Sequence, residues 1–219
     1  MKLTPEQLKR IDDIGRSIEK ADYVSALRKA EAFYRENPRH VAARERYATM
    51  LADAALYTKL PGRERMKAKA IRILRELLRS LRGVPFGVRG SIRNEYYYHT
   101  GQYLKQYRLG IELVRKGDKS SYFSQGVGAS WYAFELMHKG QVARGRRWAE
   151  VSVLAWGRHL KFEANYYYPY VNLAFAHGIL GRLDEMEKHL VTAARLAKKS
   201  RKHHEFKKVR DLIASLPSS

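Results

Sequence analysis

The sequence predicts an all-α protein built as a solenoid of about five helix-turn-helix repeats. One observation is a turn of a small, a polar and an apolar residue, which recurs at intervals of about 40 residues or of twice that length. Its copies are Ala21-Asp22-Tyr23, Gly101-Gln102-Tyr103, Gly140-Gln141-Val142 and Gly181-Arg182-Leu183. A second observation is that apolar residues between these turns recur every three or four positions, which is the spacing of one helix face. Strand signals are weak, so we expect helices only.

The first two helices are expected to form an antiparallel pair. The segment Thr4-Pro5-Glu6-Gln7 has a hydroxyl cap, a proline at the first helical position and a glutamine that can reach back to the cap, so a helix should begin there. A second helix, from about Asp22 to Glu36, is expected to end at Asn37-Pro38. The two apolar stripes are Leu8, Ile11, Ile14 and Ile18, and Tyr23, Ala26, Leu27, Ala30 and Phe33.

The same pattern continues along the chain and predicts a single repeat domain over residues 1–219. The other expected helices cover 40–58, 63–82, 91–100, 103–116, 127–138, 141–157, 165–179, 183–199 and 201–215. The expected hairpins are 1–38, 40–82, 88–116, 124–157 and 164–199. A capping helix over 201–216 is expected to close the solenoid, because its apolar residues can dock on the last hairpin.

These residues resemble the tetratricopeptide repeat family. The best match is the second helix of the first unit, at Asp22-Tyr23, Ala26, Ala30, Phe33 and Pro38, and the resemblance covers about residues 8 to 199. It implies a right-handed superhelix of helix A and helix B pairs, with a concave groove lined by each helix A. The period of about 40 exceeds the family's usual ~34 residues, so related arrays with longer repeats stay an alternative for the fold. The unit around 41–82 matches the family pattern poorly.

Charge is the strongest compositional feature. The chain has 43 Lys and Arg residues against 22 Asp and Glu residues, a net charge of +21, and this excess favours an anionic partner such as nucleic acid or an acidic protein segment. The excess is spread along the whole chain. There are no cysteines, and no apolar run approaches the ~20 residues that span a bilayer. The expectation is a soluble cytoplasmic protein, with membrane attachment through the last basic helix as a weak alternative.

No motif predicts catalysis, a metal or a cofactor. The glycine-rich stretches at 83–91 and 124–128 lack the lysine of a phosphate-binding loop, so we interpret them as loops between helices. The eight histidines include no pair at metal-binding spacing, and His177 is expected to be a packing residue. The serines lack a nucleophile elbow. We therefore expect a non-enzymatic protein; a catalytic site assembled between helices is the third alternative.

The resemblance maps the groove-lining face of helix A onto nine residues. Such a lining is aromatic with a few polar groups, and an asparagine can hold a peptide backbone, so an extended or helical protein segment is the expected guest. The alternative for each residue is that it packs against the next repeat. The family's clamp for terminal carboxylates is matched only at Asn172, so recognition of a chaperone's acidic tail is not expected. The nine residues are Tyr98, His99, Phe134, Met137, His138, Tyr168, Val171, Asn172 and Phe175.

Two basic stripes are candidate contacts with an anionic partner. The first lies within about 100° on a helical wheel, opposite an apolar stripe, and consists of Arg65, Arg72, Arg75, Arg79 and Arg82. The second includes Lys198, Lys199, Arg201, Lys202, Lys207 and Lys208. The first functional hypothesis is a protein-interaction scaffold or adaptor that holds an acidic or extended protein segment in the groove. The alternative is RNA binding, in which the basic stripes contact phosphates and tyrosines stack bases. The sequence leaves the oligomeric state open.

Overall fold

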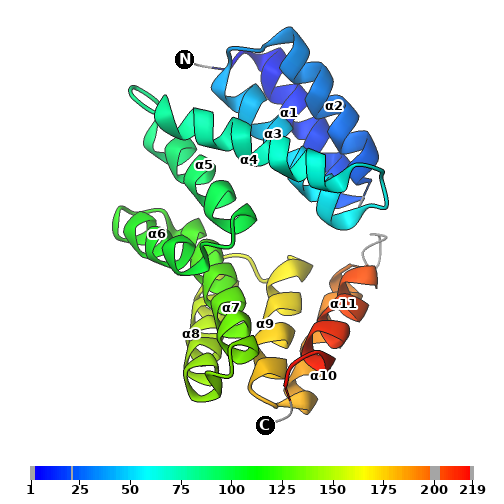
Figure 1. Ribbon diagram of the computed structural model, residues 1–219, viewed down its shortest axis with the longest axis vertical. Coiled ribbons are helices and arrows are strands. Elements are labelled where there is room, and N and C mark those ends of the chain that lie inside the picture. The colour runs from blue at the N-terminus through cyan, green and yellow to red at the C-terminus, as the bar shows by residue number, and fades with distance from the viewer. Residues whose placement is uncertain (1–2, 21, 198–202, 218–219) are drawn as a thin grey trace. The chain divides into compact units, whose positions relative to one another are not determined.

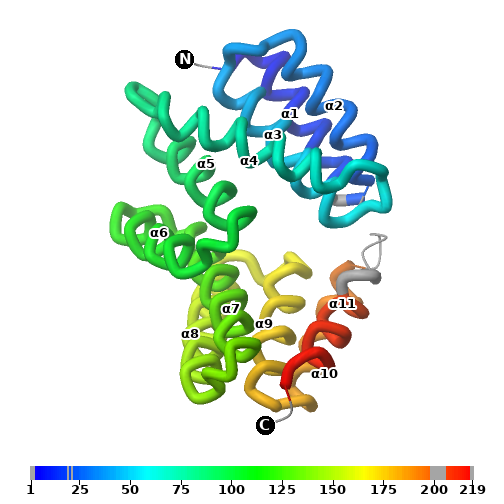
Figure 2. The backbone as a smooth tube through the Cα atoms, in the orientation of Figure 1, coloured from blue at the N-terminus to red at the C-terminus, as the bar shows by residue number. Residues whose placement is uncertain are grey.

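The computed structural model describes residues 3–20, 22–197 and 203–217, and within these ranges it contains helices and no strand. The all-α class predicted from the sequence is confirmed. Figure 1 labels the helices, and Figure 2 traces the backbone in the same view. They are α1 (Pro5–Glu19), α2 (Tyr23–Glu36), α3 (Val41–Tyr57), α4 (Arg63–Arg79), α5 (Phe86–His99), α6 (Tyr103–Arg115), the 3-10 helix η1 (Lys119–Ser121), α7 (Tyr122–His138), α8 (Val142–Leu160), α9 (Tyr167–Ile179), α10 (Leu183–Leu196) and α11 (His203–Ala214).

The chain divides into two compact units, unit 1 (Met1–Gly101) and unit 2 (Gln102–Ser219). In unit 1, α1 packs on α2 and α3 packs on α4, while α5 packs on α4 and α3. In unit 2, α7 packs on α8 and α9 on α10, while α6 packs on α7 and α11 on α9. This packing of consecutive helices in pairs is consistent with a helical-repeat solenoid. The right-handed superhelix, the period of about 40 residues and the single domain stay predictions.

Helix starts follow the local chemistry of the sequence. Thr4 and Gln7 form the expected capping box, since the Gln7 N–H donates to Thr4 Oγ1 at 3.2 Å and the Thr4 N–H donates to Gln7 Oε1 at 3.0 Å. The turn glycines Gly101, Gly140 and Gly181 have φ values of 70°, 71° and 76°. Glycine adopts this left-handed conformation without a Cβ clash, and it commonly follows the last residue of a helix. This explains why the recurring turn begins with glycine.

Two expected loops are helical instead. The stretch 124–128 lies inside α7, and α5 begins at Phe86, within the stretch 83–91. In α7 the glycines serve close packing: a Cβ on Gly126 would lie 2.4 Å from Cε2 of Trp156, and one on Gly128 would lie 2.7 Å from the backbone nitrogen of Tyr107. Glycine has a low helix propensity, but at these two positions it allows the helices to pack closely. The expected helices 91–100 and 127–138 were each about five residues too short at their starts.

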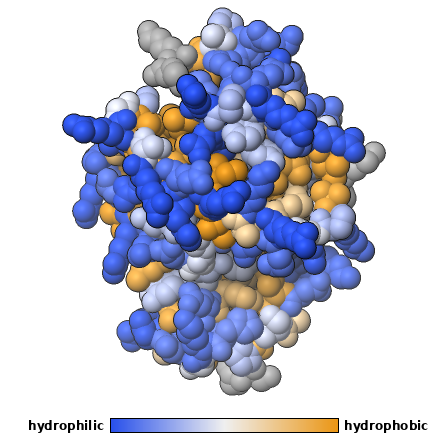
Figure 3. All heavy atoms as spheres, turned by 45° about the horizontal axis from the view of Figure 1, so that its top comes forward, coloured by the Kyte–Doolittle hydropathy of each residue, from blue (hydrophilic) through white to orange (hydrophobic). Residues whose placement is uncertain are grey.

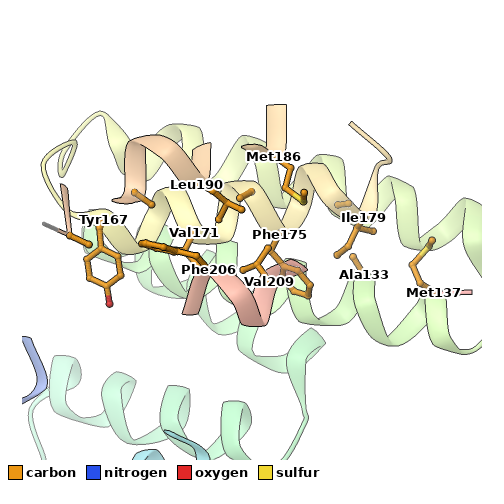
Figure 4. Close-up of a cluster of buried hydrophobic side chains, with 14 residues drawn as sticks. Ala133, Met137, Tyr167, Val171, Phe175, Ile179, Met186, Leu190, Phe206 and Val209 are labelled. Atoms are coloured by element: carbon orange, nitrogen blue, oxygen red, sulfur yellow. The ribbon is translucent and has the colours of Figure 1, made fainter. Parts of the chain in front are cut away.

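Each unit has its own hydrophobic core. In unit 1 one cluster centres on Leu74 and Ile92, and another centres on Phe33 and Ile14. In unit 2 a single cluster joins α7, α8, α9, α10 and α11. Figure 4 shows Phe175, Val171 and Leu190 within this cluster. Phe206 and Val209 of α11 are buried there too, so the last helix docks through its apolar face.

Candidate binding surfaces

One surface of α4 and the residues just after it carries five exposed arginines, which we name the arginine face. The opposite side of α4 buries Ala70, Ile73, Leu74 and Leu77 against the core of unit 1. Because a helix presents residues three and four positions apart on the same side, this burial directs the arginines into solvent. The arginine face consists of Arg65, Arg72, Arg75, Arg79 and Arg82, all of them exposed. Figure 3 shows hydrophilic side chains over much of one side of the molecule, with hydrophobic areas between them.

The arginine face keeps its positive charge. Among the described residues, none of its five guanidinium groups lies in an ion pair, although other arginines of unit 1 do. Glu76, a carboxylate of the same helix, is bound by Arg44 of α3 at 2.6 Å. Exposed ion pairs add little stability but do neutralise charge locally. The five arginines are therefore available to an anionic ligand.

The second basic stripe falls largely outside the described residues. Lys198, Lys199, Arg201 and Lys202 lie there, and their roles stay predictions. Lys207 is exposed and Lys208 is half-buried on α11. The neighbouring Arg210 donates two hydrogen bonds to Glu187 of α10, at 2.9 and 2.7 Å, and this contact raises the pKa of Arg210. Part of the positive charge of α11 is thus paired with a carboxylate of α10.

The nine residues mapped to the groove differ in accessibility. His138 is exposed, and Tyr98, Phe134 and Tyr168 are half-buried. The five that are buried are His99, Met137, Val171, Asn172 and Phe175. The Asn172 amide donates to the backbone oxygen of Tyr168 at 3.0 Å, so its hydrogen-bonding capacity is used partly within its own helix. A groove role for the nine stays a prediction, and packing between helices accounts for the buried ones.

The reason for this burial is the position of α9. Helices α7, α8, α10 and α11 all contact it, and its residues from Val171 to Ile179, most of them apolar, are all buried. In Figure 4 Val171 and Phe175 point toward side chains of α10 and α11. A helix that is hydrophobic all round is a core helix. The accessible remainder of the mapped face is therefore small.

A second accessible surface was missed by the sequence reasoning. Phe162, in the loop between α8 and α9, is 56% exposed, and its ring stacks on Tyr122 at the start of α7 with a centroid distance of 6.3 Å and an angle of 6°. We name these two rings the aromatic platform. The Lys119 ammonium lies 5.4 Å from the Phe162 centroid, and the Arg158 guanidinium lies 6.0 Å from the Tyr122 centroid. The available signal was an aromatic residue directly after the basic last turn of α8, at Arg158 and Lys161.

The residue that follows Tyr122 belongs to a group of packed aromatic rings. Phe123, next to Tyr122, packs edge-on against Trp156 at 5.3 Å and stacks on Tyr168 at 5.4 Å. Trp156 is fully buried, and Gly126 leaves the space that its indole fills. Burial lowers the pKa of the adjacent His159, while Glu163, 3.2 Å away, acts in the opposite direction. Phe123, the residue beside Tyr122 in the sequence, is therefore held by packing against other aromatic rings.

Titratable groups are also buried elsewhere. Glu45 of α3 is 7% exposed, accepts a hydrogen bond from the Ser91 hydroxyl at 2.9 Å, and has a pKa raised first by burial and further by Glu95. In unit 2, His177 and His189 stack at 5.2 Å, and burial lowers the pKa of both. Within the described ranges, no group of three or more His, Asp or Glu side chains is arranged to hold a metal ion.

No family model, curated protein or solved structure matches the chain. The resemblance to tetratricopeptide repeats therefore stays a prediction from the residues themselves. In the described part of the chain, every helix is too short or too polar to cross a membrane.

Proposed function

We propose that the protein binds single-stranded nucleic acid, with RNA as the ligand, and that the arginine face contacts its phosphates. The observation that carries this proposal is the set of five exposed arginines, none in an ion pair among the described residues. Arginine presents a planar fork of donors that matches phosphate geometry, and it stays charged at any physiological pH. Five such groups, four on one side of α4 and one just after it, supply repeated phosphate contacts.

The distribution of charge supports a long polyanion as the ligand. Residues 1–101 carry 22 basic and 12 acidic groups, a net charge of +10, and residues 102–219 carry 21 and 10, a net charge of +11. A partner protein would offset positive charge only where it docks. A nucleic acid strand carries a charge at every nucleotide and can offset it over a wide area.

A protein-interaction scaffold is the second candidate. It is favoured by two residues of α7, the exposed His138 and the half-buried Phe134. Their ring centroids are 4.4 Å apart. An aromatic residue and a polar residue side by side suit an extended acidic segment. The same experiment separates the two candidates.

The test compares labelled single-stranded RNA with an acidic peptide of equal charge, using the full chain freed of bound nucleic acid. The variant Arg72→Gln, Arg75→Gln, Arg79→Gln removes three charges from the arginine face. The matched control, Arg10→Gln, Arg16→Gln, Arg35→Gln, removes three charges from the same unit, each already paired with a carboxylate. Fluorescence anisotropy measures each affinity, and circular dichroism verifies that both variants remain helical.

We expect RNA to bind more tightly than the peptide. The arginine-face variant should bind RNA about tenfold or more weakly than the unmodified protein. The control variant should change RNA affinity far less, because its arginines already have partners. An equal loss in both variants would mean that only net charge matters and would contradict the role of the arginine face. Tighter binding of the peptide would favour the scaffold.

A further inference from the structure

We propose that the aromatic platform, Tyr122 and Phe162, is a stacking site for one unpaired base of a single-stranded nucleic acid. This inference rests on the function proposed above and adds the part of the ligand that unit 2 would bind. A base presents a flat π-face whatever its identity, and stacking on an exposed aromatic ring is how many proteins bind single strands without reading their sequence.

The geometry of the two rings suits a flat ligand. Tyr122 and Phe162 are nearly parallel, at 6° and a centroid distance of 6.3 Å, so they form an offset stack to which a third ring can be added. Phe162 is 56% exposed, whereas most aromatic rings of unit 2 are half-buried or buried. A base can replace Lys119 over the Phe162 ring, because an exposed cation–π contact is weaker than base stacking.

The charges around the rings suit a ligand with phosphates. Lys119, Arg158 and Lys161 are exposed, and none has a carboxylate partner among the described residues. The two carboxylates next to Lys119 and Phe162 in the sequence are engaged: Asp118 accepts hydrogen bonds from Ser120 and Ser121, and Glu163 lies beside His159. A purely apolar partner would gain nothing from Lys119 and Arg158 beside the rings, whereas a nucleotide would offer its phosphate to them.

The loop that presents Phe162 is fixed before any ligand arrives. The Phe162 and Glu163 N–H groups donate to the carbonyl oxygen of His159 at 2.9 and 3.2 Å, and the Tyr170 hydroxyl donates to the carbonyl oxygen of Ala164 at 3.1 Å. A ring that is already held in place loses little conformational entropy when a base stacks on it. The platform is thus preorganised for its ligand.

The experiment separates base contacts from phosphate contacts. The affinity of the full chain is measured for a short oligouridylate and for an abasic strand of the same length, which keeps the backbone charge and lacks the bases. The variants are Phe162→Ala, Phe162→Leu and Phe162→Trp. The matched control is Leu154→Ala on α8, which removes an apolar side chain that is 62% exposed. Because these side chains are exposed, the tryptophan fluorescence of unit 2 should stay unchanged in Phe162→Ala and Leu154→Ala.

We expect Phe162→Ala to weaken oligouridylate binding about fivefold or more and to leave the abasic strand unaffected. Phe162→Trp should retain the preference for bases, Phe162→Leu should lose it, and Leu154→Ala should behave as the unmodified protein. The inference is overturned if Phe162→Ala changes neither affinity, if it weakens both strands equally, or if Phe162→Leu retains the full preference.

Failure of the underlying function gives a different result. If the unmodified protein binds neither strand, the proposed nucleic-acid function is wrong, and the proposed base-stacking site is wrong as well. If it binds both strands equally and the binding depends on Arg72, Arg75 and Arg79, the function stands and only the base-stacking site is wrong.

Discussion

The two units carry almost the same net charge, +10 and +11, but they present it in different ways. In unit 1 the arginine face has four guanidinium groups on α4 and a fifth just after it, and among the described residues of this unit they have no carboxylate partner and no aromatic residue is exposed. In unit 2 the exposed cations Lys119 and Arg158 lie near the stacked rings of the aromatic platform, and the exposed Lys161 precedes Phe162 in the sequence. Two units of nearly equal net charge therefore differ in how their charged side chains are exposed and paired.

The units also differ in their buried titratable groups. In unit 2 burial lowers the pKa of His159, His177 and His189. In unit 1 burial lowers the pKa of His40 and raises that of Glu45. Protonation of the histidines opposes folding, whereas protonation of Glu45 favours it. The two units should therefore respond differently to acid.

The largest expected effect is the loss of a core side chain in one unit. Phe33→Ala removes a fully buried ring from the core of unit 1 and should destabilise that unit by about 3–5 kcal/mol. All three tryptophans, Trp131, Trp148 and Trp156, lie in unit 2, so their fluorescence reports that unit. Hydrogen exchange should show opening of α2 and α3.

The outcome also measures how strongly the units are coupled. A fluorescence midpoint in urea that stays near that of the unmodified protein would show that unit 2 unfolds independently. If the free energy of unfolding of unit 2, derived from this midpoint, fell as much as that of unit 1, the separation into two cores would be contradicted.

A smaller effect is expected at Gly126. Gly126→Ala places a Cβ within 2.4 Å of the Trp156 ring, which is held in the core, so overpacking should cost about 1–3 kcal/mol and outweigh the gain in helix propensity. The control is Gly157→Ala on the exposed side of α8, where nothing lies within 4 Å of the new Cβ. It should stabilise the helix by about 0.5–1 kcal/mol. Urea denaturation measures both; stabilisation by Gly126→Ala would be incompatible with the packing described.

The smallest expected effect is the response of unit 2 to pH. A histidine whose pKa is lower in the folded state than in the unfolded state binds fewer protons when folded, so stability is lost as the pH falls from about 6.5 through the folded pKa values. The tryptophan-detected midpoint should therefore fall between pH 7.5 and about 5.5.

Glu45 acts in the opposite direction in unit 1. Its raised pKa gives stability below about 4.5 that is lost as the pH rises through the folded value, and His40 partly offsets this. Hydrogen exchange of α3 should thus change less with acid than that of α9. A tryptophan midpoint that rises on acidification would contradict the assignment for unit 2.

Much of the helical framework could be predicted from the sequence because it depends on local chemistry. The capping box at Thr4 and the turns at Gly101, Gly140 and Gly181 use residues whose preferences act within one turn of chain. The exposure of the arginine face likewise follows from helical spacing, which places five arginines opposite an apolar stripe.

The remaining features depend on contacts between distant residues. The sequence around Gly126 and Gly128 resembles a loop. These glycines lie within a helix because Trp156 and Tyr107, which are distant in the sequence, pack closely against them. The platform joins Tyr122 to Phe162, which no local pattern pairs. Burial of Val171 and Phe175 depends in the same way on α11 packing over α9.

The most direct test of the account is the salt dependence of RNA binding, from about 50 to about 300 mM, for the unmodified protein, for Arg72→Gln, Arg75→Gln, Arg79→Gln together, and for Phe162→Ala. Each phosphate contact on a single strand adds about 0.7 to the slope of log affinity against log salt concentration. The account predicts that the arginine variant lowers the slope by about 2 and that Phe162→Ala weakens binding without changing the slope. An unchanged slope in the arginine variant, or an equal fall in both, would contradict the assignment of phosphates to the arginine face and of a base to the aromatic platform.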